Sequence, residues 1–277
     1  MKTKILITGA AGFLGSHLVT ALKDLYDVLA LDKNYHEFDE QVQFLWQPFE
    51  TVDRLNIEDV SAVIHCANEA RIDPSWQHYE KYYQTNLTNT AKFFEYCQSI
   101  GIKKFIYVSS SSAKHPFNPY AISKLASEYT LKALTKDCQL IIARPFTIYG
   151  PGMVLGNRGT AIGKFIDRYL NKLPLEVRGE GTQRRDYIHV DDVVRAMLLL
   201  LDKADPGTYD VGTGQNVSIN EIADVFETNV LHAIPKGIEY DTLADRSDLE
   251  QFGFAADQRV IKWLKQQKQE SFKELLC

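Results

Sequence analysis

Hydrophobic residues in the first half of the chain form short runs that alternate with amphipathic segments. Six of these runs, rich in Val, Ile, Leu and Phe with little alternation, are typical of strands buried on both faces of a sheet. They are Lys4–Thr8, Asp27–Leu31, Val42–Trp46, Ala62–Cys66, Phe105–Ser109 and Gln139–Ala143. Helical patterns lie between most of them, notably at Phe13–Asp24, Trp76–Ser99 and Tyr120–Thr135. This alternation predicts an α/β fold, a Rossmann-type doubly wound parallel sheet.

The pattern loosens after residue 144, where prolines and glycines break the chain into loops. Helical patterns recur at Ala161–Asn171, Val190–Leu201, Ile219–Thr228 and Gln258–Gln267. We expect residues 1–150 to form the Rossmann domain, with a later segment at about 185–215 returning to it. Residues 151–277 are expected to form mostly a small C-terminal lobe over the carboxyl edge of the sheet.

The composition narrows the classes of partner. The 277 residues carry a net charge of −5, which argues against a nucleic-acid-binding surface. We expect no membrane association, since no basic run exceeds a pair and no apolar stretch reaches signal-peptide or membrane-spanning length. The four cysteines, Cys66, Cys97, Cys138 and Cys277, lack metal-ligand spacing, as do the seven histidines. These observations predict a cytoplasmic protein whose thiols are reduced and that binds no metal.

Three glycines follow the first predicted strand. Gly9, Gly12 and Gly15 stand three residues apart, directly before a predicted helix. Glycines let the backbone turn sharply and let a phosphate approach closely. The helix start then offers free N–H groups and the positive end of the helix dipole to a pyrophosphate. The segment favours a dinucleotide-binding turn, although a packing turn before a helix has the same pattern.

Asp32 ends the second predicted strand, twenty residues after Gly12. A carboxylate there can hydrogen-bond both hydroxyls of an adenosine ribose, and it repels a 2′-phosphate. This position predicts NAD rather than NADP as the cofactor.

Tyr120 and Lys124 are four residues apart, so they share one face of the predicted helix. A phenol, with an ordinary pKa of about 10, is a poor base at neutral pH, but a nearby ammonium stabilises the phenolate. The pair is a proton-transfer device if it stands beside a bound dinucleotide. Without that context, the same spacing is common on solvated helix faces.

As a set, these motifs resemble the extended short-chain dehydrogenase/reductases. The set comprises GAAGFLG, Asp32, His65-Cys66-Ala67, Asn86, the serine run Ser109–Ser112 and Tyr120-xxx-Lys124. Three later segments, RPFTIYGP (144–151), RDYIHVDD (185–192) and YDVGTG (209–214), resemble the NAD-dependent epimerase/dehydratase branch, which includes UDP-glucose 4-epimerases. The resemblance spans about residues 3–230.

The resemblance implies NAD as the cofactor. The glycines would line its pyrophosphate, Asp32 would hold the adenosine ribose, and Lys124 would hold the nicotinamide ribose. Ala67 would pack beside the cofactor, and Asn86 would order the active-site backbone or a water. The implied cofactor-binding residues are Gly9, Gly12, Phe13, Leu14, Gly15, Asp32, Lys33, Ala67, Asn86, Tyr120 and Lys124.

The resemblance also implies catalytic and substrate-binding residues. Tyr120 would be the general base that accepts a sugar hydroxyl proton, tuned by Lys124, and Ser110 would hydrogen-bond the reacting oxygen, with Ser111 as the alternative. Arg185 would bind the nucleotide diphosphate through its guanidinium fork. The implied substrate-binding residues are Ser111, Thr147 and Arg185.

The implied activity is a nucleotide-sugar 4-epimerase that passes through a transient 4-keto intermediate. A 4-keto reductase or dehydrogenase of a nucleotide-linked deoxysugar, using NAD(P)H, has the same residues and remains an alternative. A non-catalytic cofactor-sensing protein is a third reading. Dehydratases carry acidic residues where this chain has Ser111 and Ser112, so water elimination ranks low. Thr147 also replaces the asparagine usual in the branch.

A homodimer is the expected assembly. In relatives, the helices that match Trp76–Ser99 and Tyr120–Thr135 form a four-helix bundle between subunits. Phe93, Phe94, Tyr96, Leu125 and Leu131 are the candidate residues for that face.

Overall fold

The computed structural model describes residues 2–51, 55, 57–233, 243–244 and 247–276, so Cys277 lies outside the described residues. The chain divides into two compact units, which are treated separately. Unit 1 comprises residues 1–144 and 194–209, and unit 2 comprises residues 145–193 and 210–277.

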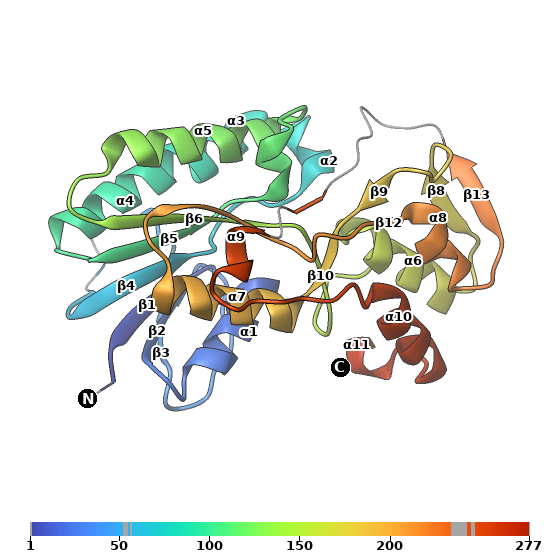
Figure 1. Ribbon diagram of the computed structural model, residues 1–277, viewed down its shortest axis with the longest axis horizontal. Coiled ribbons are helices and arrows are strands. Elements are labelled where there is room, and N and C mark those ends of the chain that lie inside the picture. The colour runs from blue at the N-terminus through green and yellow to red at the C-terminus, as the bar shows by residue number, and fades with distance from the viewer. Residues whose placement is uncertain (1, 52–54, 56, 234–242, 245–246, 277) are drawn as a thin grey trace. The chain divides into compact units, whose positions relative to one another are not determined.

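A seven-stranded sheet forms the centre of unit 1, in the order β11-β6-β5-β4-β1-β2-β3 (Figure 1). The strands are β1 (Lys4–Thr8), β2 (Asp27–Asp32), β3 (Gln43–Trp46), β4 (Val60–His65), β5 (Lys104–Val108), β6 (Gln139–Pro145) and β11 (Gly207–Val211). The six strands from β1 to β6 pair in parallel. Their order reverses between β1 and β4, which is the switch point of a doubly wound fold. The predicted fold class is confirmed.

Burial on both faces of the sheet explains why apolar runs in the sequence predicted the strands correctly. Nearly every residue of β1, β2, β4, β5 and β6 is buried, whereas β3, at the sheet edge, is exposed at both ends. All six predicted strands form, and their ends differ from the predicted bounds by at most two residues. β11 was not predicted as a strand, since its sequence GTYDV lacks a continuous apolar run.

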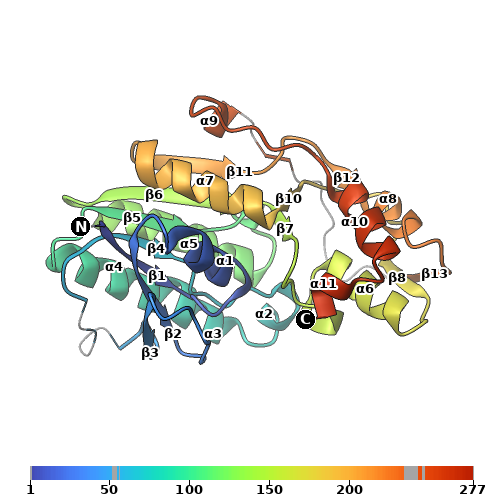
Figure 2. The same ribbon diagram turned by 90° about the horizontal axis from the view of Figure 1, so that it is seen from below.

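Helices cover both faces of the sheet (Figures 1 and 2). α1 (Phe13–Leu22) and α7 (Val190–Lys203) lie on one face, and α4 (Thr90–Ser99) and α5 (Pro119–Leu134) on the other. Phe93, Phe94 and Leu131 are fully buried in the core of unit 1. Their assignment to a dimer face was therefore wrong, because they face the sheet.

The predicted helix Trp76–Ser99 is not continuous. α2 (Ile72–Ser75) ends before it, α3 (Tyr79–Tyr82) begins three residues late, and a π-helical segment (Tyr83–Asn89) precedes α4. In that segment the carbonyl of Asn86 accepts a hydrogen bond from the Ser127 hydroxyl of α5 at 2.7 Å. This contact with another element accompanies the local departure from α-helical spacing, and single π-helical turns concentrate at functional sites.

Unit 2 consists of short strand pairs and helices. β7 (Thr147–Tyr149) pairs with β10 (Tyr187–His189), β9 (Arg184–Arg185) with β12 (Val217–Ser218), and β8 (Leu175–Arg178) with β13 (Val230–Ala233). The remaining elements are the 3₁₀ turn Gly156–Arg158, α6 (Ala161–Leu170), α8 (Ile219–Asp224), α9 (Ser247–Glu250), α10 (Val260–Gln269) and α11 (Lys273–Leu276). In the part of the chain that the structure describes, no helix could span a membrane.

Candidate active site

At two of the three glycines in the turn after β1, neighbouring backbone atoms leave no room for a side chain. Gly9 has φ +67°, and a Cβ there would lie 2.7 Å from the backbone nitrogen of Ala67. A Cβ on Gly15 would lie 2.1 Å from the carbonyl oxygen of Gly9. Contacts within the protein require glycine at both positions. Gly9 and Gly15 are therefore explained by a packing turn before a helix.

Gly12 differs, because protein contacts alone do not account for it. It is exposed, its φ is −79°, and a Cβ would meet only the Gly9 carbonyl at 3.1 Å. Gly12 is also the N-cap of α1 and supplies no side-chain cap, so the first N–H groups of the helix point outward without a capping oxygen. An exposed glycine before an uncapped helix start fits the pyrophosphate of a dinucleotide.

Asp32 is positioned by the same turn. Its carboxylate accepts hydrogen bonds from the N–H of Ala11 at 3.0 Å and from the N–H of Asn34 at 2.8 Å. The side chain is nearly buried but remains at the carboxyl end of β2, beside the glycine turn. Both carboxylate oxygens are thus fixed by backbone N–H groups, and ribose binding by Asp32 stays a prediction. Lys33 is exposed and its Nζ lies 3.6 Å from Glu69 Oε1, and Leu14 is a buried residue of α1.

A buried hydrogen-bonded chain connects the ends of β1 and β4. The Thr8 hydroxyl contacts His65 Nδ1 at 2.7 Å and accepts the N–H of Ala67 at 3.2 Å, while His65 Nε2 contacts the Thr90 hydroxyl at 3.2 Å. Burial lowers the pKa of His65 to about 3, so its ring is neutral. This series of hydrogen bonds holds Ala67 against Gly9. Sequence analysis noted His65 only as part of a motif and missed Thr8 and Thr90.

Asn86 has no exposed surface. Its amide accepts the N–H of Glu69 at 2.8 Å and donates to the Glu69 carbonyl at 3.0 Å and to the Ser123 hydroxyl at 2.9 Å. The side chain thus orders the segment after β4 against α5. It acts on the backbone of the site rather than presenting a group to a ligand.

Tyr120 and Lys124 lie in the first two turns of α5, as predicted. The Asn118 side chain caps this helix by accepting the N–H of Ala121 at 2.9 Å. Lys124 is 1% exposed; its Nζ donates to the Val108 carbonyl at 2.7 Å and lies 4.3 Å from the centre of the Tyr107 ring. Burial lowers the pKa of Lys124 to about 7, opposed by the negative charge of Glu128. An amine that changes charge near neutral pH suits proton transfer.

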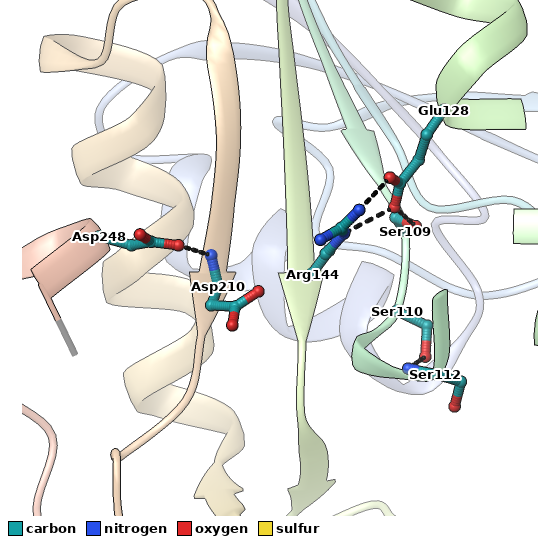
Figure 3. A network of polar contacts seen from close by, with 7 residues as sticks. All are labelled: Ser109, Ser110, Ser112, Glu128, Arg144, Asp210 and Asp248. Atoms are coloured by element: carbon teal, nitrogen blue, oxygen red, sulfur yellow. Dashed lines mark hydrogen bonds and ion pairs between the residues drawn. The ribbon is translucent and has the colours of Figure 1, made fainter. Parts of the chain in front are cut away.

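A buried ion pair that was not predicted from the sequence lies one helical turn beyond Lys124. Glu128 accepts hydrogen bonds from both Arg144, at the end of β6, and the hydroxyl of Ser109, just after β5 (Figure 3). The pair ties α5 to the ends of two strands. The spacing of Tyr120, Lys124 and Glu128 on one helix face was the signal that could have revealed it.

Ser110, the residue after Ser109, is the N-cap of the 3₁₀ turn Ser111–Lys114. Its hydroxyl accepts the N–H of Ser112 at 3.2 Å (Figure 3). Ser110 is half-buried, whereas Ser111 is nearly buried. The structure therefore brings Ser110 and Lys124 to the same end of β5, where Lys124 binds the carbonyl of Val108.

Thr147 and Arg185 belong to unit 2, on β7 and β9. Thr147 donates its N–H to the Asp186 carbonyl at 3.0 Å, and the Arg185 guanidinium donates to the Arg184 carbonyl at 2.9 Å. Both residues are half-buried. Asp186 beside them is fully buried and accepts hydrogen bonds from Thr213, Gly214 and Ala244; its burial raises its pKa.

The sequence pattern of the NAD dependent epimerase/dehydratase family matches residues 5–212. The chain belongs to this family. Its members are NAD-dependent enzymes, and the match includes the glycine turn, Asp32, the Tyr120–Lys124 helix and Arg185. The resemblance seen in the sequence is thereby confirmed.

Relatives within the family include UDP-sugar 4-epimerases and dTDP-D-glucose 4,6-dehydratases. The UDP-glucuronate 4-epimerase of Thermodesulfobacterium geofontis is 29% identical over 262 residues, covering 80% of this chain and 79% of that protein. The structure of MoeE5 with UDP-glucuronic acid and NAD is 30% identical, with a TM-score of 0.86 over 97% of this chain and 99% of that one. The UDP-glucose 4-epimerase of Thermotoga maritima with UDP-glucose is 25% identical, with a TM-score of 0.88 over 99% and 100%.

Proposed function

We propose that this chain is an NAD-dependent 4-epimerase of a UDP-linked hexose or hexuronic acid. The observation that carries the proposal is a set of three groups: Tyr120 and the fully buried Lys124, four residues apart on α5, and the half-buried Ser110 just after β5, whose last carbonyl binds Lys124. Serines at positions 111 and 112 leave this set without a carboxylic acid.

Each residue of the set has a distinct role in the proposal. Tyr120 accepts the proton of the sugar 4-hydroxyl as its carbon is oxidised, and returns it when the carbon is reduced. The Lys124 ammonium stabilises the phenolate, and Ser110 donates a hydrogen bond to the reacting oxygen. NAD, when bound along the glycine turn and Asp32, supplies the hydride acceptor and donor.

Water elimination is not supported. Removing a hydroxyl from the sugar requires an acid that protonates the leaving group. The hydroxyls of Ser111 and Ser112 have too high a pKa for that work. The lack of a carboxylic acid at positions 111 and 112 is compatible with both epimerisation and 4-keto reduction, so a turnover assay must distinguish these two activities.

The substrate class rests on the relatives and on unit 2. MoeE5 binds UDP-glucuronic acid and UDP-glucose, and the Thermotoga maritima enzyme binds UDP-glucose. In this chain Arg185 supplies the fork that suits a diphosphate, with Thr147 as a second polar group on the neighbouring strand pair. We assign the UDP moiety to these residues.

The decisive experiment is an NMR-followed turnover assay. In the first arm, each of four UDP-sugars is incubated with trace NAD+: UDP-glucose, UDP-galactose, UDP-glucuronic acid and UDP-N-acetylglucosamine. In the second arm, the same UDP-sugars and a set of 4-keto-6-deoxy sugars are each incubated with excess NADH. A 4-epimer formed with trace NAD+ supports the proposal. Product formed only with stoichiometric NADH contradicts it and makes the enzyme a reductase. Turnover with neither, despite NAD binding, contradicts this substrate class.

We also propose a homodimer in the cytoplasm. On α5, Ile122 and Tyr129 are exposed at 42% and 66%, one face of the helix away from the core. These residues replace the buried Phe93, Phe94 and Leu131 as candidates for a subunit interface. A cytoplasmic location agrees with the free thiols of Cys66, Cys97 and Cys138. Light scattering on wild type and Tyr129→Glu tests the dimer: a monomeric wild type contradicts it.

A further inference from the structure

Two large aromatic side chains are exposed at the edge of the sheet in unit 1. Trp46, the last residue of β3, is 65% exposed, and Tyr35, in the loop after β2, is 66% exposed. Their ring centres are 5.5 Å apart at an angle of 68°. Contiguous apolar patches exposed on soluble proteins can mark ligand-binding surfaces.

Trp46 lies directly beside the ribose-binding candidate Asp32. The two residues are register partners in the parallel β2–β3 pair, so their side chains emerge side by side at the carboxyl end of the sheet. The indole Nε1 donates to the Lys33 carbonyl at 3.0 Å. The polar edge of the ring is thus already bonded, and its apolar face is what remains exposed.

The order of the strands places the parts of a dinucleotide along the sheet edge. Ser110 and Lys124 mark the nicotinamide end at β5, the glycine turn marks the pyrophosphate at β1, and Asp32 marks the adenosine ribose at β2. The next strand outward is β3 (Figure 1). A base attached to a ribose held at Asp32 therefore extends toward the end of β3, where Trp46 stands.

We propose that Trp46, braced by Tyr35, stacks on the adenine of NAD. The inference rests on the proposed NAD site and adds to it the residues that hold the base. Aromatic stacking is worth enough per base to change affinity about tenfold. Two further rings extend the aromatic cluster, since the Phe44 ring centre lies 6.3 Å from that of Tyr35 and 5.3 Å from that of Phe38.

The test measures binding, not turnover. ADP-ribose is titrated by calorimetry into wild type, Trp46→Leu, Trp46→Phe and, as the matched control, Trp76→Leu. Trp76 is also exposed, at 54%, but lies after α2. We expect about tenfold weaker binding for Trp46→Leu, near-wild-type binding for Trp46→Phe, which keeps a ring but loses the Nε1 donor, and no change for Trp76→Leu. Thermal unfolding confirms that each variant is folded.

Two results would overturn the inference. Unchanged ADP-ribose affinity in Trp46→Leu means that the base lies elsewhere. Equal losses in Trp46→Leu and Trp46→Phe mean that Trp46 acts through its bond to Lys33 rather than by stacking. If wild type binds neither ADP-ribose nor NAD, the proposed function itself fails. NAD binding that is indifferent to Trp46 leaves the proposed function intact and removes only this inference.

Discussion

Glu128 and Arg144 form a two-pronged ion pair between α5 and the end of β6. Arg144 Nε donates to Glu128 Oε1 at 2.9 Å, and Nη2 donates to Oε2. Glu128 is 1% exposed and also accepts the Ser109 hydroxyl. Because Ser109 precedes Ser110 and Glu128 lies one turn after Lys124, this pair holds the helix that carries Tyr120 and Lys124 against the segment that follows β5.

Breaking the Glu128–Arg144 pair should destabilise unit 1. Glu128→Gln removes the negative charge that faces the guanidinium of Arg144 in a buried setting, so we expect a loss of about 3 kcal/mol in the free energy of unfolding. Urea denaturation measures it. The double variant Glu128→Gln, Arg144→Met should recover part of the loss, because the positive charge is removed together with the negative one. A single variant as stable as wild type would contradict the pair's structural role.

Lys124 should make stability depend on pH in a defined direction. Its pKa is lowered by burial to about 7 in the folded protein, from 10.5 ordinarily, so between these values the unfolded chain binds more protons. The free energy of unfolding therefore rises with pH over that window. Lys124→Met should stabilise the protein more at pH 6 than at pH 9, while abolishing turnover. Urea denaturation at both pH values measures this.

The control for Lys124→Met is Lys132→Met, on the exposed side of the same helix. It should change stability equally at the two pH values. A Lys124→Met effect that is also the same at pH 6 and pH 9 would show that the amine is not held in a desolvated site.

Alanine substitutions at Gly15 and Gly12 should affect different properties, the first stability and the second NAD binding. Gly15→Ala places a Cβ 2.1 Å from the Gly9 carbonyl, so the unfolding free energy should fall by about 2 kcal/mol or more. Gly12→Ala meets that carbonyl at 3.1 Å and should change stability little, but its methyl group occupies the phosphate approach. We expect about tenfold weaker NAD binding by calorimetry. Unaltered NAD affinity in Gly12→Ala would place the pyrophosphate elsewhere.

Tyr120→Phe should separate chemistry from binding. Removing one hydroxyl eliminates the general base, so turnover should fall by about a thousandfold. NAD affinity should stay within about twofold, because the ring remains in place beside Tyr82, 6.3 Å away between ring centres. Tyr79→Phe, at an exposed tyrosine of α3, is the control. Retained turnover in Tyr120→Phe would refute the assigned mechanism.

Local sequence was enough for the features that depend on neighbours along the chain. Doubly buried strands, the glycine turn after β1, Asp32 at the end of β2 and the four-residue spacing of Tyr120 and Lys124 were all predicted, and the structure has them in those elements. Periodicity and turn chemistry act over a few residues, so the sequence by itself determined the fold class, the family and the main candidate residues.

Contacts between distant segments were decided only by the tertiary structure. Asn86 bonds to Glu69 and Ser123, and its helix adopts π geometry that no helical periodicity predicts. The sequence pattern likewise could not say that Phe93 and Phe94 face the sheet rather than a second subunit, since both surfaces favour apolar residues. Arg144 lies sixteen residues from Glu128, and Trp46 comes beside Asp32 only through strand pairing. Such partners are chosen by packing in three dimensions, which a one-dimensional pattern does not record.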